Sequence, residues 1–130
     1  MSRILLVDDE ESVRVTIGAL LKAHGHEVVT AVDGKEGVEQ FVQDTFDLVI
    51  TDVLMPRMGG AATIATLRQI RPGLRVIAIS GAQRVAADGA AETASRLRAD
   101  RLLIKPFAQE ELLAAVAEVL GDATAGPAGT

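Results

Sequence analysis

Five short apolar runs, separated by segments of helical periodicity, constrain the fold of this chain more than any other feature. The runs comprise residues 3–7, 27–31, 48–51, 74–79 and 101–104. Short aliphatic and β-branched runs bounded by turn residues are typical of strands buried on both faces. Strict alternation of such strands with helices predicts a parallel sheet with helices on both faces, joined by right-handed crossovers.

The segments between the runs carry apolar residues at the spacing of amphipathic helices. Asp33 and Glu36 are typical of a capping box at a helix start, and Gly25 of a helix C-cap. For residues 82–99 we expect a loop and then a helix over roughly residues 90–98. The apolar residues of the other predicted helices are Val13, Ile17, Leu20 and Leu21; Val38, Phe41 and Val42; Ile64, Leu67 and Ile70; and Leu112, Leu113, Val116, Val119 and Leu120.

Length and composition allow one core and exclude several classes of protein. The chain has 130 residues, 48% hydrophobic, and we expect one domain over residues 1–121 and a disordered tail over 122–130. The absence of cysteine excludes a disulfide scaffold and a thiolate zinc site. No run is long enough to span a membrane, and a net charge of −5 argues against direct nucleic-acid binding. We expect a cytoplasmic protein, as a monomer or weak dimer.

The length and the strand–helix units favour a flavodoxin-like, doubly wound (βα)5 fold with a five-stranded parallel sheet in the order 2-1-3-4-5. In that order the first, third, fourth and fifth strands are neighbours, and their carboxyl ends converge on one edge of the sheet. Open α/β folds bind ligands at this edge. The polar residues that end these four strands are Asp8 and Asp9, Asp52, Ser80 and Lys105.

This set of side chains suits phosphoryl transfer. Crowded carboxylates repel one another unless a cation neutralises them, and oxygen ligands without cysteine select Mg²⁺ or Mn²⁺ over zinc. Lys105 and Ser80 can bind phosphoryl oxygens, which leaves Asp52 as a nucleophile that forms an aspartyl phosphate. His24 and His26 fall at the opposite edge of the predicted sheet, where we expect solvated loop side chains.

The chain resembles the receiver domains of two-component response regulators over residues 3–120, in family order and at family-like spacing. The resemblance implies a signalling module that takes a phosphoryl group from a sensor histidine kinase or a phosphotransfer protein. It implies catalysis only of its own phosphorylation and dephosphorylation, so the chain is not expected to be an enzyme in the ordinary sense. The matching pieces are ILLVDDE at 4–10, LVITDVLMPRMGG at 48–60, VIAISG at 76–81 and LIKPF at 103–107.

Residue by residue, the resemblance makes Asp52 the phosphoacceptor. It implies that Ser80 contacts the phosphoryl group, that Lys105 pairs with it, and that the peptide bond from Lys105 to Pro106 is cis. Phosphorylation is then expected to reach an unknown downstream protein by protein–protein contact, unless the chain is a fragment of a larger regulator.

The resemblance also implies the metal ligands. Mg²⁺ (or Mn²⁺) is expected on Asp9, Asp52 and the backbone carbonyl of Leu54, with Asp8 acting mainly through water.

Two departures from the family pattern concern signal output. Many receivers carry Tyr or Phe three residues before the lysine, where this chain has Leu102, and the segment between Ser80 and Lys105 is about three residues longer than usual. A receiver-like scaffold that signals without phosphorylation is therefore the alternative. An aspartate-nucleophile phosphatase is disfavoured, because such enzymes need a second acid where Leu54 stands, and a nucleotide or flavin site is disfavoured because no Gly-rich loop follows the first strand.

Overall fold

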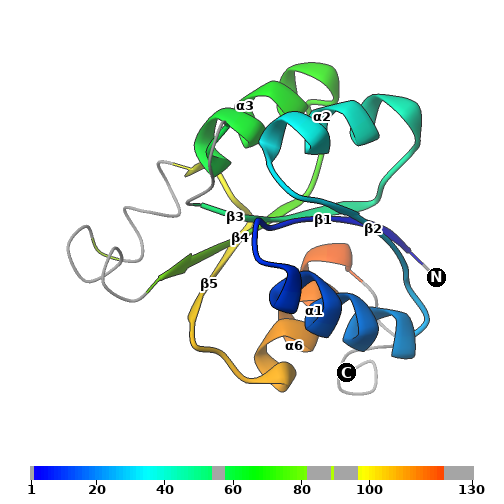
Figure 1. Cartoon of the computed structure of the whole chain (residues 1–130), viewed down its shortest axis with the longest axis vertical. Helices are drawn as coiled ribbons and strands as arrows, with labels where there is room; N and C mark the ends of the chain where they lie inside the picture. The colour runs from blue at the N-terminus through cyan, green and yellow to red at the C-terminus, as the bar shows by residue number, and fades with distance from the viewer. Residues whose placement is uncertain (1, 54–57, 82–88, 90–96, 122–130) are drawn as a thin grey trace.

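The structure, a computed structural model, describes residues 2–53, 58–81, 89 and 97–121. Its five-stranded sheet has the order β2-β1-β3-β4-β5 with every pairing parallel, which confirms the predicted flavodoxin-like topology. Helices α2 and α3 cover one face of the sheet and α1 and α6 the other (Figure 1). The elements are β1 (Arg3–Val7), α1 (Glu11–Ala23), β2 (Glu27–Ala31), α2 (Gly34–Gln43), β3 (Leu48–Asp52), α3 (Gly60–Ile70), β4 (Val76–Gly81), β5 (Arg101–Lys105) and α6 (Gln109–Leu120).

Each central strand supplies two hydrophobic cores, because successive side chains point to opposite faces of the sheet. In β1, Leu5 and Val7 belong to the core that contains Phe41 of α2, whereas Ile4 and Leu6 belong to the core that contains Ile17 of α1. Strand β3 is buried along its whole length. The sheet is therefore a rigid central layer, and the side chains at its edges are held by strands buried on both sides.

The helix ends follow the predicted local chemistry. Asp33 accepts a hydrogen bond from the backbone N–H of Glu36 at 2.8 Å, and the Glu36 carboxylate accepts one from the N–H of Val32 at 2.9 Å. Gly25, just after α1, has a φ of 90°, the left-handed conformation that glycine adopts without a steric penalty.

The first turns of α2 and α3 are in close contact. A Cβ atom on Gly34 would lie 2.1 Å from Oγ1 of Thr63 and 2.6 Å from the carbonyl oxygen of Met58. Only a residue without a side chain fits at position 34 in this arrangement.

Some sequence expectations need correction. Val42 and Ile70 are among the apolar helix positions of the sequence pattern, but they are 62% and 47% exposed. Val42 follows the buried Phe41 directly and so points about 100° around the helix from it, and Ile70 is the last residue of α3. Strand β4 begins at Val76 rather than at residue 74, because the N–H of Leu74 instead closes a turn onto the carbonyl of Arg71 at 3.0 Å.

The expected helix over residues 90–98 and the expected tail over 122–130 lie largely or wholly outside the described residues. None of the described helices is both long and apolar enough to cross a membrane.

Candidate functional site

The carboxyl edge of the sheet brings together the polar residues that end its strands. Asp52 is the last residue of β3 and Lys105 the last of β5, while Ser80 pairs with Ile104 in the ladder between β4 and β5. Asp8 follows β1 directly, and its N–H is anchored to the carbonyl of Ala31 at 3.1 Å. These four side chains therefore reach one edge because the strands that carry them are neighbours in the sheet.

Lys105 and Asp52 form the central ion pair of the site. Nζ of Lys105 lies 3.1 Å from Oδ2 of Asp52, and Asp52 is only 6% exposed. Burial of Lys105 lowers the pKa of its ammonium group. The hydrogen bond and charge of Asp52, with the charges of Asp8 and Glu10, outweigh this effect and leave the pKa raised. The lysine is thus a permanent cation directly beside the Asp52 carboxylate.

Asp8 is a fully buried carboxylate. Its pKa is raised to about 6, mainly by desolvation and also by the charges of Asp52 and Asp9, which together outweigh the hydrogen bond from the N–H of Glu10 and the charge of Lys105. Its Oδ1 accepts that hydrogen bond at 2.9 Å, whereas Oδ2 is buried with no hydrogen-bond partner in the described part of the chain. One oxygen of the Asp8 carboxylate is therefore buried without a hydrogen bond to offset its desolvation.

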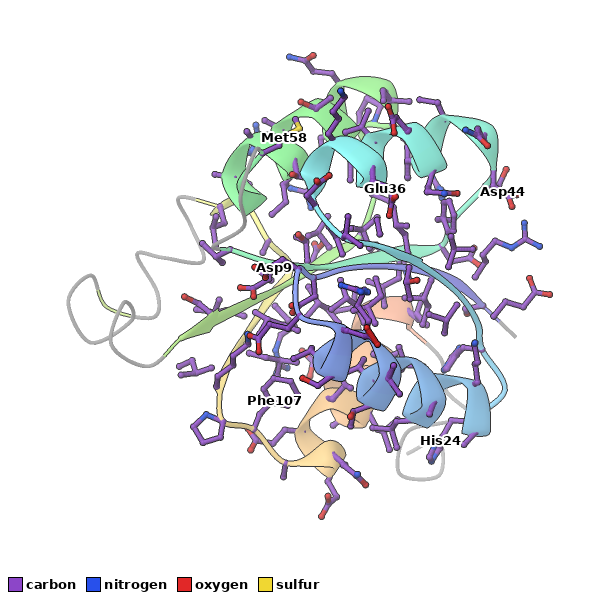
Figure 2. The ribbon with its side chains drawn as sticks, viewed as in Figure 1. Asp9, His24, Glu36, Asp44, Met58 and Phe107 are labelled. Carbon is purple, nitrogen blue, oxygen red and sulfur yellow. The ribbon has the colours of Figure 1, made fainter. Side chains whose placement is uncertain are left out.

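The acids at this edge form a group that includes a residue the sequence analysis does not single out. Asp8, Glu10 and Asp52 each place a carboxylate oxygen within 4.8 Å of the others. Asp9 is exposed and stands outside this group, in the connection between β1 and α1 (Figure 2). Glu10 was not among the predicted site residues. No sequence signal singles it out, because an acid at the start of a helix is equally expected to cap that helix.

The remaining predicted site residues are Ser80 and Leu54. Ser80 is buried, and its Oγ has no hydrogen-bond partner among residues 2–53, 58–81, 89 and 97–121. Leu54, the predicted carbonyl ligand, lies outside the described residues. The bond between Lys105 and Pro106 is cis, as the resemblance implied.

The start of α3 lies directly against the strand that carries Asp52. A Cβ atom on Gly60 would lie 2.7 Å from the carbonyl oxygen of Asp52 and 2.8 Å from Cα of Val53, and the N–H of Gly60 bonds the Val53 carbonyl at 2.9 Å. The start of α3 therefore packs closely against the backbone of Asp52 and Val53.

The donor set fits a hard divalent cation. Carboxylate oxygens are the preferred ligands of Mg²⁺ and Mn²⁺, and a buried, unpartnered Oδ2 on Asp8 is an oxygen that such an ion would satisfy. A cation would also relieve the repulsion that raises the pKa of Asp8.

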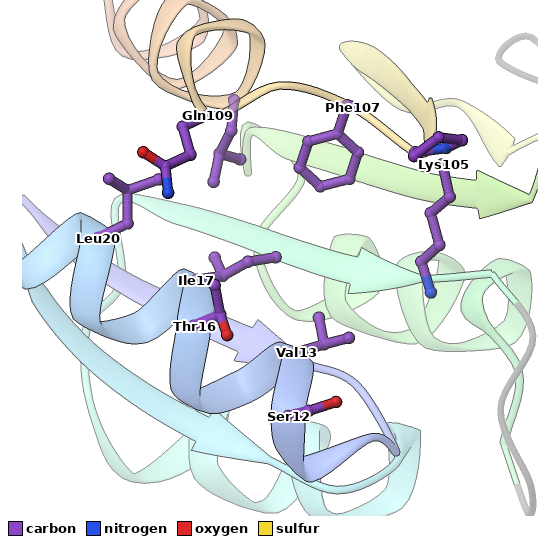
Figure 3. Close-up of a pocket in the computed structure, with 10 residues that line it drawn as sticks. Ser12, Val13, Thr16, Ile17, Leu20, Lys105, Phe107 and Gln109 are labelled. Carbon is purple, nitrogen blue, oxygen red and sulfur yellow. The ribbon is translucent and has the colours of Figure 1, made fainter.

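An apolar groove begins beside Lys105 and runs between α1 and the segment that joins β5 to α6. It encloses about 390 Å³ and is lined by Val13, Ile17 and Leu20 of α1 and by Phe107 and Leu112 from the opposite wall. Figure 3 shows Lys105 at one end of this groove and the Phe107 ring facing α1. His24 and His26 lie at the far end of α1, where the Nδ1 atom of His24 is 3.0 Å from the carbonyl of Leu20.

Comparison with known proteins identifies relatives of the whole domain. The family model described as "Response regulator receiver domain" matches residues 4–117. Response regulator MprA of Mycolicibacterium vanbaalenii is 37% identical over 120 residues, which cover 91% of this chain and 50% of that protein. MprA of Mycobacterium leprae gives the same values. The chain therefore spans about half the length of the curated relatives it matches.

Solved structures agree in fold along nearly the whole chain. A response regulator receiver domain protein from Clostridium thermocellum has a TM-score of 0.83 at 29% identity, covering 95% of this chain and 98% of that one. Response regulator TrrA of Thermotoga maritima, solved in complex with Mg²⁺-BeF, has a TM-score of 0.79 at 29% identity, covering 92% and 99%.

Proposed function

The chain belongs to the response regulator receiver domains of two-component systems, and on that premise we propose that it accepts a phosphoryl group on Asp52 from a histidine kinase or phosphotransfer protein. The observation that carries the proposal is the Lys105 Nζ at 3.1 Å from Oδ2 of Asp52, within a buried acidic group. Burying charged groups in this way costs free energy of folding, and a scaffold that does not bind phosphate would gain nothing in return.

In the proposed reaction an Asp52 carboxylate oxygen attacks phosphorus. The bond from phosphorus to the donor's imidazole nitrogen breaks as the bond from phosphorus to Oδ forms, and the imidazole leaves with its electron pair and takes a proton from solvent. Lys105 neutralises part of the phosphoryl charge, and the Ser80 hydroxyl donates a hydrogen bond to a phosphoryl oxygen. Attack of water on phosphorus then releases inorganic phosphate and restores the carboxylate. The chain thus catalyses its own phosphorylation and dephosphorylation and no other turnover.

We propose Asp9, Asp52 and the backbone carbonyl of Leu54 as ligands of Mg²⁺ (or Mn²⁺), with Asp8 acting through water. When bound, the ion neutralises charge on the phosphoryl oxygens. The structure of TrrA, solved in complex with Mg²⁺-BeF, supports Mg²⁺ as the ion by similarity. The buried, unpartnered oxygen of Asp8 supports it from this chain's own residues.

The other proposed properties concern the domain and its partners. We propose that residues 1–121 form the receiver domain, that 122–130 form a disordered tail, and that the protein acts in the cytoplasm as a monomer or weak dimer. The apolar groove beside Lys105 is the surface that we assign to the phosphodonor protein, because Lys105 lines this groove and also pairs with Asp52. Output would reach a downstream protein through direct contact.

The test is phosphorylation of the isolated chain. The protein is incubated with Mg²⁺ and acetyl phosphate, and intact mass and acid–base lability report the adduct. We expect an acid-stable, base-labile phosphoryl adduct that Asp52→Asn abolishes. Asp47→Asn is the matched control, because Asp47 precedes the same strand at its other end and bonds the N–H of Arg3 there. The absence of any adduct on a folded wild-type chain would refute the proposal.

A further inference from the structure

Glu10 lies on the solvent side of the two buried acids of the site, Asp8 and Asp52. Its carboxylate belongs to the group formed with Asp8 and Asp52, yet its side chain is 59% exposed whereas theirs are buried. Its Oε1 lies 3.7 Å from Nζ of Lys105, so the lysine has Glu10 on its solvent side and Asp52 below. Glu10 is therefore the exposed acid of the group that also contains Asp8 and Asp52.

The position of Glu10 also departs from the ordinary behaviour of a residue at a helix start. Glu10 is the N-cap of α1, but its side chain makes no capping hydrogen bond to that helix. Its backbone N–H is held by Oδ1 of Asp8 at 2.9 Å, and its carbonyl accepts from the N–H of Arg14 at 3.1 Å. Both backbone contacts fix the residue, and the carboxylate lies among like charges rather than over the N–H groups of α1, where the helix dipole would stabilise it.

We propose that Glu10 is a specificity-determining residue that repels small anionic phosphodonors and so reserves Asp52 for a protein donor. The inference rests on the proposed phosphorylation of Asp52. A second effect acts in the same direction, because Glu10 shares Lys105 with Asp52 and competes with an incoming phosphoryl group for that cation. A protein donor can offset the repulsion with its own contacts along the apolar groove, whereas a small acyl phosphate has none to offer.

The expected size follows from Coulomb's law. Two unit charges about 4 Å apart in water repel by about 1 kcal/mol, which corresponds to about fivefold in a rate constant. Removing the Glu10 charge should therefore raise the second-order rate constant for phosphoramidate, which has a net charge of about −1 at neutral pH, by up to about fivefold. For the dianion acetyl phosphate the same repulsion acts on two charges, so the gain should be up to about 25-fold.

The experiment compares wild type, Glu10→Gln and Glu11→Gln with both donors at low and high salt. Glu11 is the matched control, because it is the next acid in the chain, is exposed, and lies outside the acidic group. We expect Glu10→Gln to react faster, more so with acetyl phosphate, and the gain to shrink as salt screens the charge. Glu11→Gln should stay within about twofold of wild type.

Each other outcome has a distinct meaning. If wild type is phosphorylated and Glu10→Gln reacts no faster than Glu11→Gln, the role of Glu10 is refuted while phosphorylation of Asp52 stands. Equal gains with both donors, unaffected by salt, would also refute selection by charge. A wild-type chain that neither donor phosphorylates, with or without Glu10, would instead overturn the proposed function itself.

Discussion

Replacing Asp8 by Asn should stabilise the metal-free protein at neutral pH. Asp8 is fully buried, and burial together with neighbouring carboxylates makes its charged form unfavourable in the folded state. Asn keeps the shape of the side chain and can still accept the hydrogen bond from the N–H of Glu10 through Oδ1. Its amide can donate toward the carboxylates that repel the charge of Asp8. The substitution therefore removes the unfavourable charge and little else.

The magnitude follows from the pKa. Asp8 has a pKa of about 6 in the folded protein against an ordinary value of 3.8, and this difference is worth about 3 kcal/mol. Because the raised pKa belongs to the folded state, the folded protein binds the proton more tightly. The stability from this group is present below about pH 4 and is lost as the pH rises through about 6. The free energy of unfolding of Asp8→Asn relative to wild type should thus rise by about 3 kcal/mol across that window.

The assay is urea unfolding in the presence of a chelator at about pH 4.5, 6 and 7.5. We expect Asp8→Asn to exceed wild type by about 2 kcal/mol at the highest pH, since burying the amide costs part of the gain. Asp9→Asn, an exposed neighbour, should stay within about 0.5 kcal/mol of wild type in the absence of metal. Adding Mg²⁺ should stabilise wild type more than Asp8→Asn. A difference between Asp8→Asn and wild type that does not vary with pH would show that the Asp8 charge is not what costs stability.

Two further predictions concern the backbone around the site. Gly60→Ala should lower the free energy of unfolding by about 1–3 kcal/mol, because the new methyl group would lie 2.7 Å from the carbonyl oxygen of Asp52. Gly73→Ala, with nothing within 4 Å of the added atom, should be nearly neutral in the same urea titration, and equal losses would contradict the steric argument. Asp33→Ala should cost about 1 kcal/mol, because it removes the cap on the N–H of Glu36. An Asp33→Asn variant, which retains the acceptor, should recover most of the loss, and failure to recover it would assign the effect to charge.

The strand order and the edge that carries the site could be predicted because they depend on patterns that span the chain. Alternation of apolar runs with helices leaves few topologies, and a residue that ends a buried run must emerge at the edge of the sheet. Asp52 and Lys105 each end such a run, so the topology brings both to the same edge, and the long Lys105 side chain closes the 3.1 Å contact across the intervening β4. The same residue types also predict the phosphoryl chemistry.

The side chain of Glu10 could not be placed in this way. An acid at a helix start can cap that helix or turn away from it, and both arrangements have the same sequence pattern. In the structure the Asp8 carboxylate accepts a hydrogen bond from the N–H of Glu10 at 2.9 Å, and the Glu10 side chain makes no capping bond to the helix. The exposure of Val42 and Ile70 was missed for a related reason. Helical periodicity indicates a face but not how far the neighbouring layer extends beneath it.

The close contacts at Gly34 and Gly60 also determine where this chain can accept an insertion. Both glycines press against the segment between β3 and α3, so an added residue there would separate α2 from α3 and shift the backbone that carries Asp52. The turn at Pro72 and Gly73, at the opposite edge of the sheet, is exposed and has open space around it. An affinity tag or fluorescent reporter belongs between these two residues, where an insertion is carried by a surface turn and leaves the site at the other end of the strands undisturbed.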